Sequence, residues 1–280
     1  MSTAASLAGR ELAAAIKAKI TAALTCLDVV PRLAIVTATA DEASAWYVRS
    51  LATAAGKTGI DCSVADLGPS ASASGIARTL ERLSADPAVH GIIVQTPLPG
   101  GARLAELAGA VDPAKDVDGA NPLSLGRLAA GLPAFAPATA TAVIELLDHY
   151  QVGIAGARVV VVGRSAVVGK PVAHLLLNRD ATVTVCHSRT PDLASVTRSA
   201  DILVAAAGRA GLIGASHVAP GMVVVDVGTN AAPDGRLVGD VAADAAEAAA
   251  AITPVPGGIG PVTTAILLRH VVDAAGPADG

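Results

Sequence analysis

The chain has 280 residues, 52% of them hydrophobic, with one Trp, two Tyr and one Phe. Twenty Lys and Arg against 24 Asp and Glu give a net charge of −4 without a basic block, which argues against nucleic acid as the main partner. No uncharged apolar stretch approaches the roughly 18 residues of a membrane span, and the first residues carry charges in a helical pattern. We therefore expect neither a membrane-spanning segment nor a signal peptide.

The three cysteines, Cys26, Cys62 and Cys186, are far apart and form no Cys-x-x-Cys pair. Their number and spacing indicate neither a disulfide framework nor a zinc site, and favour the reducing cytoplasm. The histidines show no i, i+4 pairing, so we expect no metal.

Short β-branched runs alternate with Ala- and Leu-rich amphipathic stretches. This alternation is typical of βαβ units and predicts an α/β fold whose parallel sheets are covered by helices. The expected strands are Leu33–Ala38, Ile60–Leu67, Gly91–Gln95, Arg158–Val162, Thr182–Cys186, Ile202–Ala205 and Met222–Val227. The expected helices are Ala43–Ala55, Ser72–Ser84, Thr141–Tyr150, Val168–Asn178, Leu193–Ser199, Ala242–Ala251 and Thr263–Ala275.

A long run after Val111 is rich in Pro and Gly and reads as loop. A helix follows it, and a new strand opens at Arg158. We therefore expect two α/β domains, residues 1–140 and 141–262. The C-terminal helix, residues 263–280, is expected to pack back onto the first domain.

The strand that ends at Val162 runs into a turn beginning Gly163-Arg164-Ser165, and a helix follows. A strand, a glycine turn and a helix start can present backbone N–H groups and a helix dipole to a pyrophosphate. Ser165 stands where the dinucleotide-binding fingerprint has its second glycine. The alternative is a tight turn that binds nothing.

The next strand ends in His187-Ser188-Arg189-Thr190, without the acid that usually holds the ribose of NAD. Asp180 precedes that strand and belongs to its other end. Arg164, Ser188 and Arg189 could instead hold a 2′-phosphate through charge-assisted hydrogen bonds, which favours NADP. The alternative is that both arginines are solvated surface charges.

Several short sequence motifs follow one another along the chain, and each motif alone is only weakly specific for a protein family. They include SAWY at 44–47, VQTPLPG at 94–100, KDVDG at 115–119, GRSAVVGKP at 163–171, VDVGTN at 225–230, GDV at 239–241 and TPVPGGIGPVT at 253–263. Together they closely resemble the methylenetetrahydrofolate dehydrogenase/cyclohydrolase family across nearly the whole chain.

This resemblance implies a folate-binding domain and a Rossmann-like NADP-binding domain with a cleft between them, in a homodimer. It also implies hydride transfer from 5,10-methylenetetrahydrofolate to NADP⁺, which leaves 5,10-methenyltetrahydrofolate. In the family a lysine then assists the water that hydrolyses the methenyl bridge.

The resemblance also assigns roles to single residues. Tyr47 matches the tyrosine that packs on the aromatic part of the folate, Gln95 the glutamine beside the catalytic lysine, and Asp118 the carboxylate that holds the pterin. The positions matched to the cofactor are Gly163, Arg164, Ser165, Ser188 and Thr229, with Arg189 beside them. The loop Pro256, Gly257 and Gly258 matches the one that borders both substrates.

The sequence departs from the family pattern Tyr-Val-x-x-Lys, because Leu51 occupies the position of the lysine. Arg49 lies about 200° from Tyr47 on a helix, and Lys57 is also directed elsewhere, so neither replaces the lysine. We therefore expect a dehydrogenase whose cyclohydrolase activity is weak or lost. The alternatives are a fully bifunctional enzyme, a non-catalytic paralogue that binds NADP or folate, and an oxidoreductase for a modified pterin.

Overall fold

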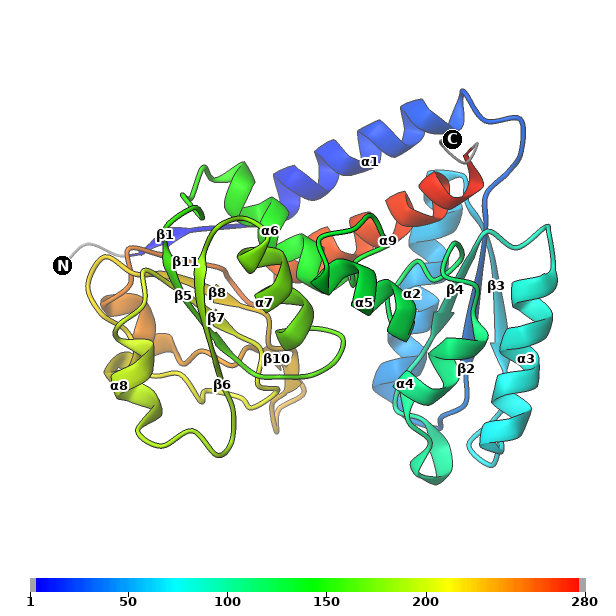
Figure 1. The fold of residues 1–280 in the computed structure, drawn as a ribbon. Helices are drawn as coiled ribbons and strands as arrows, with labels where there is room; N and C mark the ends of the chain where they lie inside the picture. The colour runs from blue at the N-terminus through cyan, green and yellow to red at the C-terminus, as the bar shows by residue number, and fades with distance from the viewer. Residues whose placement is uncertain (1–3, 277–280) are drawn as a thin grey trace. The chain divides into compact units, whose positions relative to one another are not determined.

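The computed structural model describes residues 4–276, which form two compact units (Figure 1). The three-stranded unit contains Ala14–Ala138 and the described residues from Thr264 onward. The six-stranded unit contains the described residues up to Ala13 and Thr139–Thr263. The predicted α/β fold with two domains and parallel sheets is confirmed. Within the described residues, no helix combines the length and apolar character that crossing a membrane requires.

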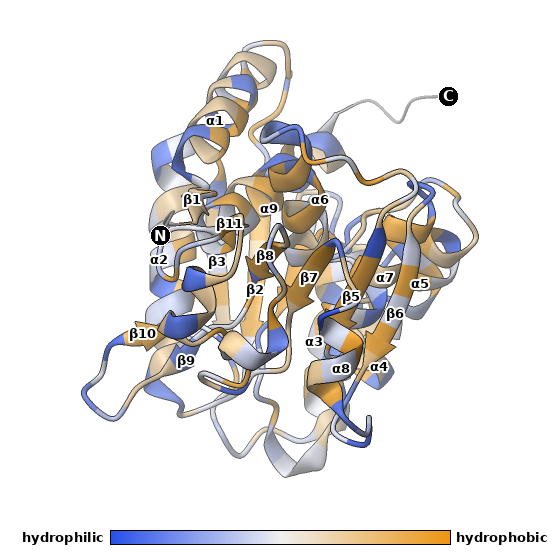
Figure 2. Cartoon of the chain, turned by 90° about the vertical axis from the view of Figure 1, so that its left-hand side faces the viewer, coloured by the Kyte–Doolittle hydropathy of each residue, from blue (hydrophilic) through white to orange (hydrophobic). Residues whose placement is uncertain are grey.

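The sheet of the three-stranded unit has the order β3-β2-β4, and both pairings are parallel. Its strands are β2 (Arg32–Thr37), β3 (Asp61–Asp66) and β4 (Gly91–Val94). Strands β2 and β4 are buried along nearly their whole length, as the continuous apolar runs predict, and Figure 2 shows β2 largely in the hydrophobic colour. Strand β3 lies at the edge and is mostly exposed.

The sheet of the six-stranded unit has the order β1-β11-β8-β7-β5-β6, and each pairing in it is parallel. Its strands are β1 (Ala5–Ser6), β5 (Arg158–Val162), β6 (Thr182–Cys186), β7 (Ile202–Ala205), β8 (Val223–Asp226) and β11 (Ala251–Ile252). The chain adds β6 on one side of β5 and β7 on the other. The strand order therefore reverses between β5 and β7, and ligands of open α/β sheets bind at such a point, beyond the carboxyl ends of the strands.

Helices connect the strands. They are α1 (Arg10–Leu24), α2 (Glu42–Thr58), α3 (Ala73–Ala85), α4 (Leu104–Leu107), α5 (Pro122–Ala129), α6 (Ala138–His149), α7 (Gly169–Leu177), α8 (Leu193–Thr197) and α9 (Ile259–Ala275). The bounds of α2, α3, α6, α7, α8 and α9 are close to those predicted, whereas α1, α4 and α5 are not among the expected helices. A short antiparallel pair, β9 (Asn230–Ala231) with β10 (Leu237–Val238), follows β8.

The predicted helix Ala242–Ala251 is wrong. A 3₁₀ turn covers only Ala243–Glu247, and the chain then enters β11. The backbone N–H of Ala250 donates to the carbonyl of Met222 at 2.9 Å, and β11 pairs with β8 on one side and β1 on the other. Strand pairing on both sides thus overrides the helix propensity of the alanines.

Candidate functional site

The turn after β5 requires glycine at two positions. Gly163 has φ 128°, and a Cβ there would collide with the carbonyl oxygen of Ala206. A Cβ on Gly169 would collide with the carbonyl of Gly163. The Oγ of Ser165 accepts hydrogen bonds from the N–H of Val168 at 3.1 Å and of Gly169 at 3.4 Å. Ser165 therefore satisfies two backbone N–H groups just before and at the first residue of α7, which gives this serine a structural role in place of the second glycine.

The same turn presents donors without acceptors. Among the described residues, the backbone N–H groups of residues 164–167 donate to no protein acceptor. Arg164, Ser165 and Ala166 are exposed, and the turn leads directly into the N-terminus of α7. Free N–H groups beside a helix N-terminus form an anion-binding cradle, so this turn fits a pyrophosphate.

A second turn leaves the sheet beside the first. The N–H of Gly163 donates to the carbonyl of Cys186 at 2.9 Å, so the turns after β5 and β6 emerge at the same edge. The N–H of His187 donates to the Oγ1 of Thr190 at 2.9 Å, which closes the second turn on itself.

The exposed side chains of this second turn are Ser188 and Arg189. Asp180 precedes β6 and lies at its other end, as predicted. Both exposed side chains can donate hydrogen bonds, and this donor set suits a phosphate rather than a ribose hydroxyl pair.

A buried aspartate fixes the loop that follows β7. The carboxylate of Asp240 accepts the N–H groups of Ala207 at 2.6 Å, Gly208 at 2.9 Å and Arg209 at 2.8 Å. This loop adjoins Ala206, against which Gly163 packs. Asp240 is not among the predicted site residues, and the string GDV is the only sequence signal for it.

One predicted cofactor position and the predicted three-residue loop line one cavity. Thr229 and the loop Pro256–Gly258 border a cavity of about 150 Å³ at the end of β8. The structure therefore brings the VDVGTN and TPVPGG strings together within the six-stranded unit.

In the three-stranded unit, α2 and the end of β4 meet at one carbonyl oxygen. The Oγ of Ser44 donates to the carbonyl of Thr96 at 3.0 Å, and the Nε2 of Gln95 donates to the same oxygen at 2.8 Å. Tyr47 follows Ser44 by one helical turn and is half-buried. Burial and, less strongly, the charge of Asp118 raise the pKa of Tyr47 to about 12, so its phenol keeps its proton at neutral pH.

Two charged residues of the KDVDG string stabilise the fold. The Nζ of Lys115 donates to the carbonyls of Ser84 at 2.8 Å and Asp86 at 2.7 Å, at the C-terminus of α3. The carboxylate of Asp116 accepts the N–H of Asn121 at 2.7 Å. These contacts position the loop that carries Asp118.

Asp118 itself remains available for a ligand. Its carboxylate makes no hydrogen bond to any described residue. Burial and the neighbouring charge of Asp116 raise the pKa of Asp118 to about 7. An unpaired carboxyl of this kind, next to Tyr47, is typical of a functional site.

The loop is also fixed from α9. The Nδ1 of His270 lies 2.8 Å from the carbonyl oxygen of Val117, one residue before Asp118. The imidazole of His270 packs against the ring of Phe135, with centroids 5.1 Å apart. The backbone carbonyl of the residue that precedes Asp118 is thus held by a buried histidine.

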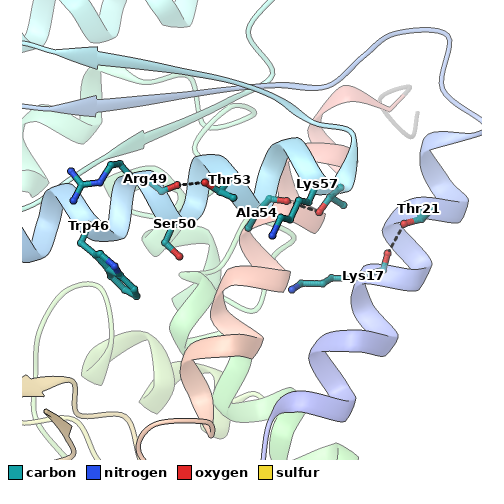
Figure 3. A pocket seen from close by; sticks show the side chains of 9 residues that line it. Lys17, Thr21, Trp46, Arg49, Ser50, Thr53, Ala54 and Lys57 are labelled. Carbon is teal, nitrogen blue, oxygen red and sulfur yellow. Dashed lines mark hydrogen bonds between the residues drawn. The ribbon is translucent and has the colours of Figure 1, made fainter.

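Leu51 lies on the core face of α2. It is 2% exposed and shares that face with Val48 and Ala55. Arg49 and Lys57 are exposed and line a groove on another face of the helix (Figure 3). The chain therefore has an aliphatic group at this position and no nearby cation on the same face.

No group of His, Cys, Asp and Glu side chains in the described part of the chain could hold a metal ion. The cysteines Cys26, Cys62 and Cys186 are free thiols.

Comparison with known proteins places both units in one family. The sequence model of the tetrahydrofolate dehydrogenase/cyclohydrolase catalytic domain matches residues 7–118. The model of the NAD(P)-binding domain of the same family matches residues 137–278. Bifunctional protein FolD 1 of Saccharopolyspora erythraea is 62% identical over 273 residues, which cover 96% of this chain and 93% of that protein.

Solved structures agree with these matches. The bifunctional methylenetetrahydrofolate dehydrogenase/cyclohydrolase of Campylobacter jejuni has a TM-score of 0.92 and 38% identity, covering 96% of this chain and 97% of that one. The Trypanosoma brucei enzyme, solved with NADP cofactor and inhibitor, has a TM-score of 0.92 and 39% identity over 98% of both chains. Both halves of the sequence and the fold that they form assign this chain to the tetrahydrofolate dehydrogenase/cyclohydrolase family.

Proposed function

We propose that this chain oxidises 5,10-methylenetetrahydrofolate to 5,10-methenyltetrahydrofolate with NADP⁺. The observation that carries the proposal is the set of unpaired N–H groups at residues 164–167, beside the guanidinium of Arg164. The T. brucei relative was solved with NADP, which supports the same cofactor here. When bound, NADP⁺ supplies the acceptor of the hydride.

The protein contributes binding and alignment to this reaction. The turn at residues 164–167 would hold the pyrophosphate, and Arg164, Ser188 and Arg189 would donate to the 2′-phosphate. Thr229 and the loop Pro256–Gly258 would border the cofactor. Asp118 would accept hydrogen bonds from the pterin, and Tyr47 would pack on the aromatic part of the folate.

For hydrolysis of the methenyl bridge, the relatives favour a bifunctional chain over one that has lost this activity. Proteins 62% identical to this chain bear the name bifunctional. The side chain of Leu51 argues against efficient hydrolysis, because it can neither transfer a proton nor donate a hydrogen bond. We therefore propose both activities, with a hydrolytic step that is slower without an amine at position 51, by the 10²- to 10⁴-fold typical of a positioned acid–base group.

One assay tests both steps. Purified protein receives methylenetetrahydrofolate and NADP⁺, and the absorbances of NADPH and of the methenyl product are followed separately. NADPH formation with slow decay of the methenyl product is the expected result. Measurable ligand binding without NADPH formation would instead support a non-catalytic paralogue. NADPH formation together with decay of the methenyl product at the uncatalysed rate would instead support a dehydrogenase that has lost its cyclohydrolase activity.

We also propose a cytoplasmic homodimer. Free thiols support the reducing compartment. Equilibrium sedimentation of the purified chain tests the dimer, and a monomer at micromolar concentration would contradict it.

A further inference from the structure

The N-terminal segment of the six-stranded unit reaches the loop Pro256–Gly258. Strand β1 pairs with β11, and the segment continues this pairing beyond the strand (Figure 1). The backbone N–H of Leu7 donates to the carbonyl of Ile252, and that of Gly9 donates to the carbonyl of Gly257, both at 2.9 Å. Two residues separate the donors and five separate the acceptors, so the intervening residues leave the line of the strand. Gly9 therefore closes the base of the loop.

A single peptide group joins this loop to the end of α6. The hydroxyl of Tyr150, the residue after α6, donates to the carbonyl of Ala8 at 2.9 Å. The N–H of the same peptide group belongs to Gly9 and donates to Gly257. The C=O and N–H of a trans peptide point in opposite directions, so the group bridges Tyr150 and the loop. The two hydrogen bonds also polarise and strengthen each other.

The close approach of the two segments requires glycine at position 9. Gly9 is buried, and a Cβ there would collide with the carbonyl oxygen of Gly258 and lie 2.7 Å from a methyl carbon of Val262. The φ of Gly9 lies outside the left-handed region, so close packing excludes a side chain and backbone conformation does not. A larger residue at position 9 therefore displaces the loop.

The loop depends on such a contact because its own backbone is permissive. Gly257 has φ 110°, and two successive glycines restrict the chain little. Inside the loop, the N–H of Gly258 donates to the carbonyl of Pro254 at 2.8 Å, and the N–H of Gly9 adds a hydrogen bond from outside. The same loop lines the cavity of about 150 Å³ together with Thr229. The position of the cavity wall is thus set partly by the N-terminal segment.

We propose that Tyr150 and Gly9 are positioning residues for hydride transfer, because the Ala8–Gly9 peptide holds the loop Pro256–Gly258 against the bound ligands. The pyrophosphate turn at residues 164–167 takes no part in this contact. The two residues should therefore govern the alignment of the ligands more than the affinity for NADP⁺. This assignment rests on the proposed function, because the loop is placed beside both substrates by family resemblance.

Single-turnover kinetics provide the first test. Tyr150→Phe removes one hydroxyl and should slow hydride transfer about two- to tenfold, as expected for one hydrogen bond. Gly9→Ala displaces the loop, and a misplacement of about 1 Å costs roughly 10²-fold in rate. Both variants should keep the Kd for NADP⁺ of the unaltered protein, measured by calorimetry. If Gly9→Ala does not fold, Tyr150→Phe, which conserves the ring, decides the question.

Gly153→Ala is the matched control for the glycine variant. Gly153 is exposed in a loop of the same unit, and a Cβ there would have open space around it. This variant should transfer hydride at the unaltered rate. An unaltered rate in Tyr150→Phe as well would overturn the proposal. A loss of NADP⁺ affinity as large as the loss of rate would also contradict it, because the contact would then serve folding alone.

Hydrogen exchange provides a test that needs no catalysis. The amides of Gly257 and Gly258 should exchange faster in Tyr150→Phe and in Gly9→Ala, because the loop opens more often without its outer contact. A peptide that covers β8 should keep its exchange rate and serves as the internal control. Unchanged exchange of the loop amides in both variants would rule out the proposed role of the Ala8–Gly9 peptide. If the unaltered protein transfers no hydride, the proposed function fails, whereas this measurement still tests the contact.

Discussion

The backbone N–H of Asp240 donates a hydrogen bond of 2.9 Å to the carboxylate of Asp226, and both aspartates are buried. The carboxylate of Asp240 in turn holds the loop after β7. Two glycines make this approach possible, because a Cβ on Gly228 would collide with Asp240 and one on Gly239 with Asp226. The strings VDVG and GDV are therefore two halves of one buried network beside the cofactor turn.

Replacing Asp240 by Asn should weaken cofactor binding and stability together. The amide places N–H groups against N–H groups of the loop, and each buried donor left unpaired costs about 1–3 kcal/mol. We expect a lower Tm and a higher KM for NADP⁺, measured by thermal unfolding and steady-state kinetics. Asp244→Asn, at an exposed position nearby, is the control and should change neither value. If the Asp240→Asn protein is destabilised but keeps a normal KM for NADP⁺, the network supports folding and does not contribute to cofactor binding.

The pH profile should follow Asp118, whose pKa is raised to about 7. Above that pH the carboxylate is charged and can accept hydrogen bonds, and below it the group is protonated. We therefore expect kcat/KM of the dehydrogenase to fall about tenfold per pH unit below pH 7, since this parameter reports the free enzyme. Asp118→Asn should lower kcat/KM and remove the inflection, whereas Asp112→Asn, exposed in the same loop, should retain it. An inflection that survives in Asp118→Asn would assign it to another group.

Arg164→Ala should reduce the preference for NADP⁺ over NAD⁺. Hydrogen bonds to charged groups are worth about 1.5–3 kcal/mol, so the KM for NADP⁺ should rise by about 10- to 150-fold. The KM for NAD⁺, which lacks the 2′-phosphate, should remain unchanged and serves as the internal control. Equal increases in the KM for NADP⁺ and for NAD⁺ would indicate that Arg164 contacts the pyrophosphate, which both cofactors share, and not the 2′-phosphate.

Leu51→Lys should accelerate hydrolysis of the methenyl bridge by about 10²- to 10⁴-fold, because it adds the amine that can assist water. The measurement is the decay of methenyltetrahydrofolate absorbance without NADP⁺. Leu51→Met conserves volume without adding a proton donor and should leave the rate unchanged. If the unaltered protein already hydrolyses rapidly and the lysine adds nothing, position 51 does not govern water attack.

Several strands were predictable because their β-branched runs are intrinsic to the sequence, whether the strand is buried, as β5 and β7 are, or mostly exposed at the sheet edge, as β6 is. Arg158–Val162, Thr182–Cys186 and Ile202–Ala205 have the predicted bounds. The two-residue strands β1 and β11 could not be found in this way, because only their partners define them. The helix α5 was also missed, since Pro and Gly around it indicated loop, although Asn121 and Pro122 form a standard helix start.

The candidate site was predictable in its residue types and not in its hydrogen bonds. Gly163 and Asp118 stand out in the strings that contain them. Asp240 and Lys115 belong to such strings as well, yet their carbonyl and N–H partners lie about 30 residues away in sequence. No local pattern encodes partners at that separation, and the roles of Tyr47, Gln95 and Asp118 toward a folate stay predictions.

The contact between His270 and Val117 spans 153 residues of sequence. At translation speeds of roughly 5–20 residues per second, the ribosome needs about 8 to 30 s to add that length. Throughout this interval the loop that carries Asp118 has been synthesised but lacks its contact with His270. The nascent three-stranded unit thus acquires the finished form of this loop only after residue 270 has been synthesised.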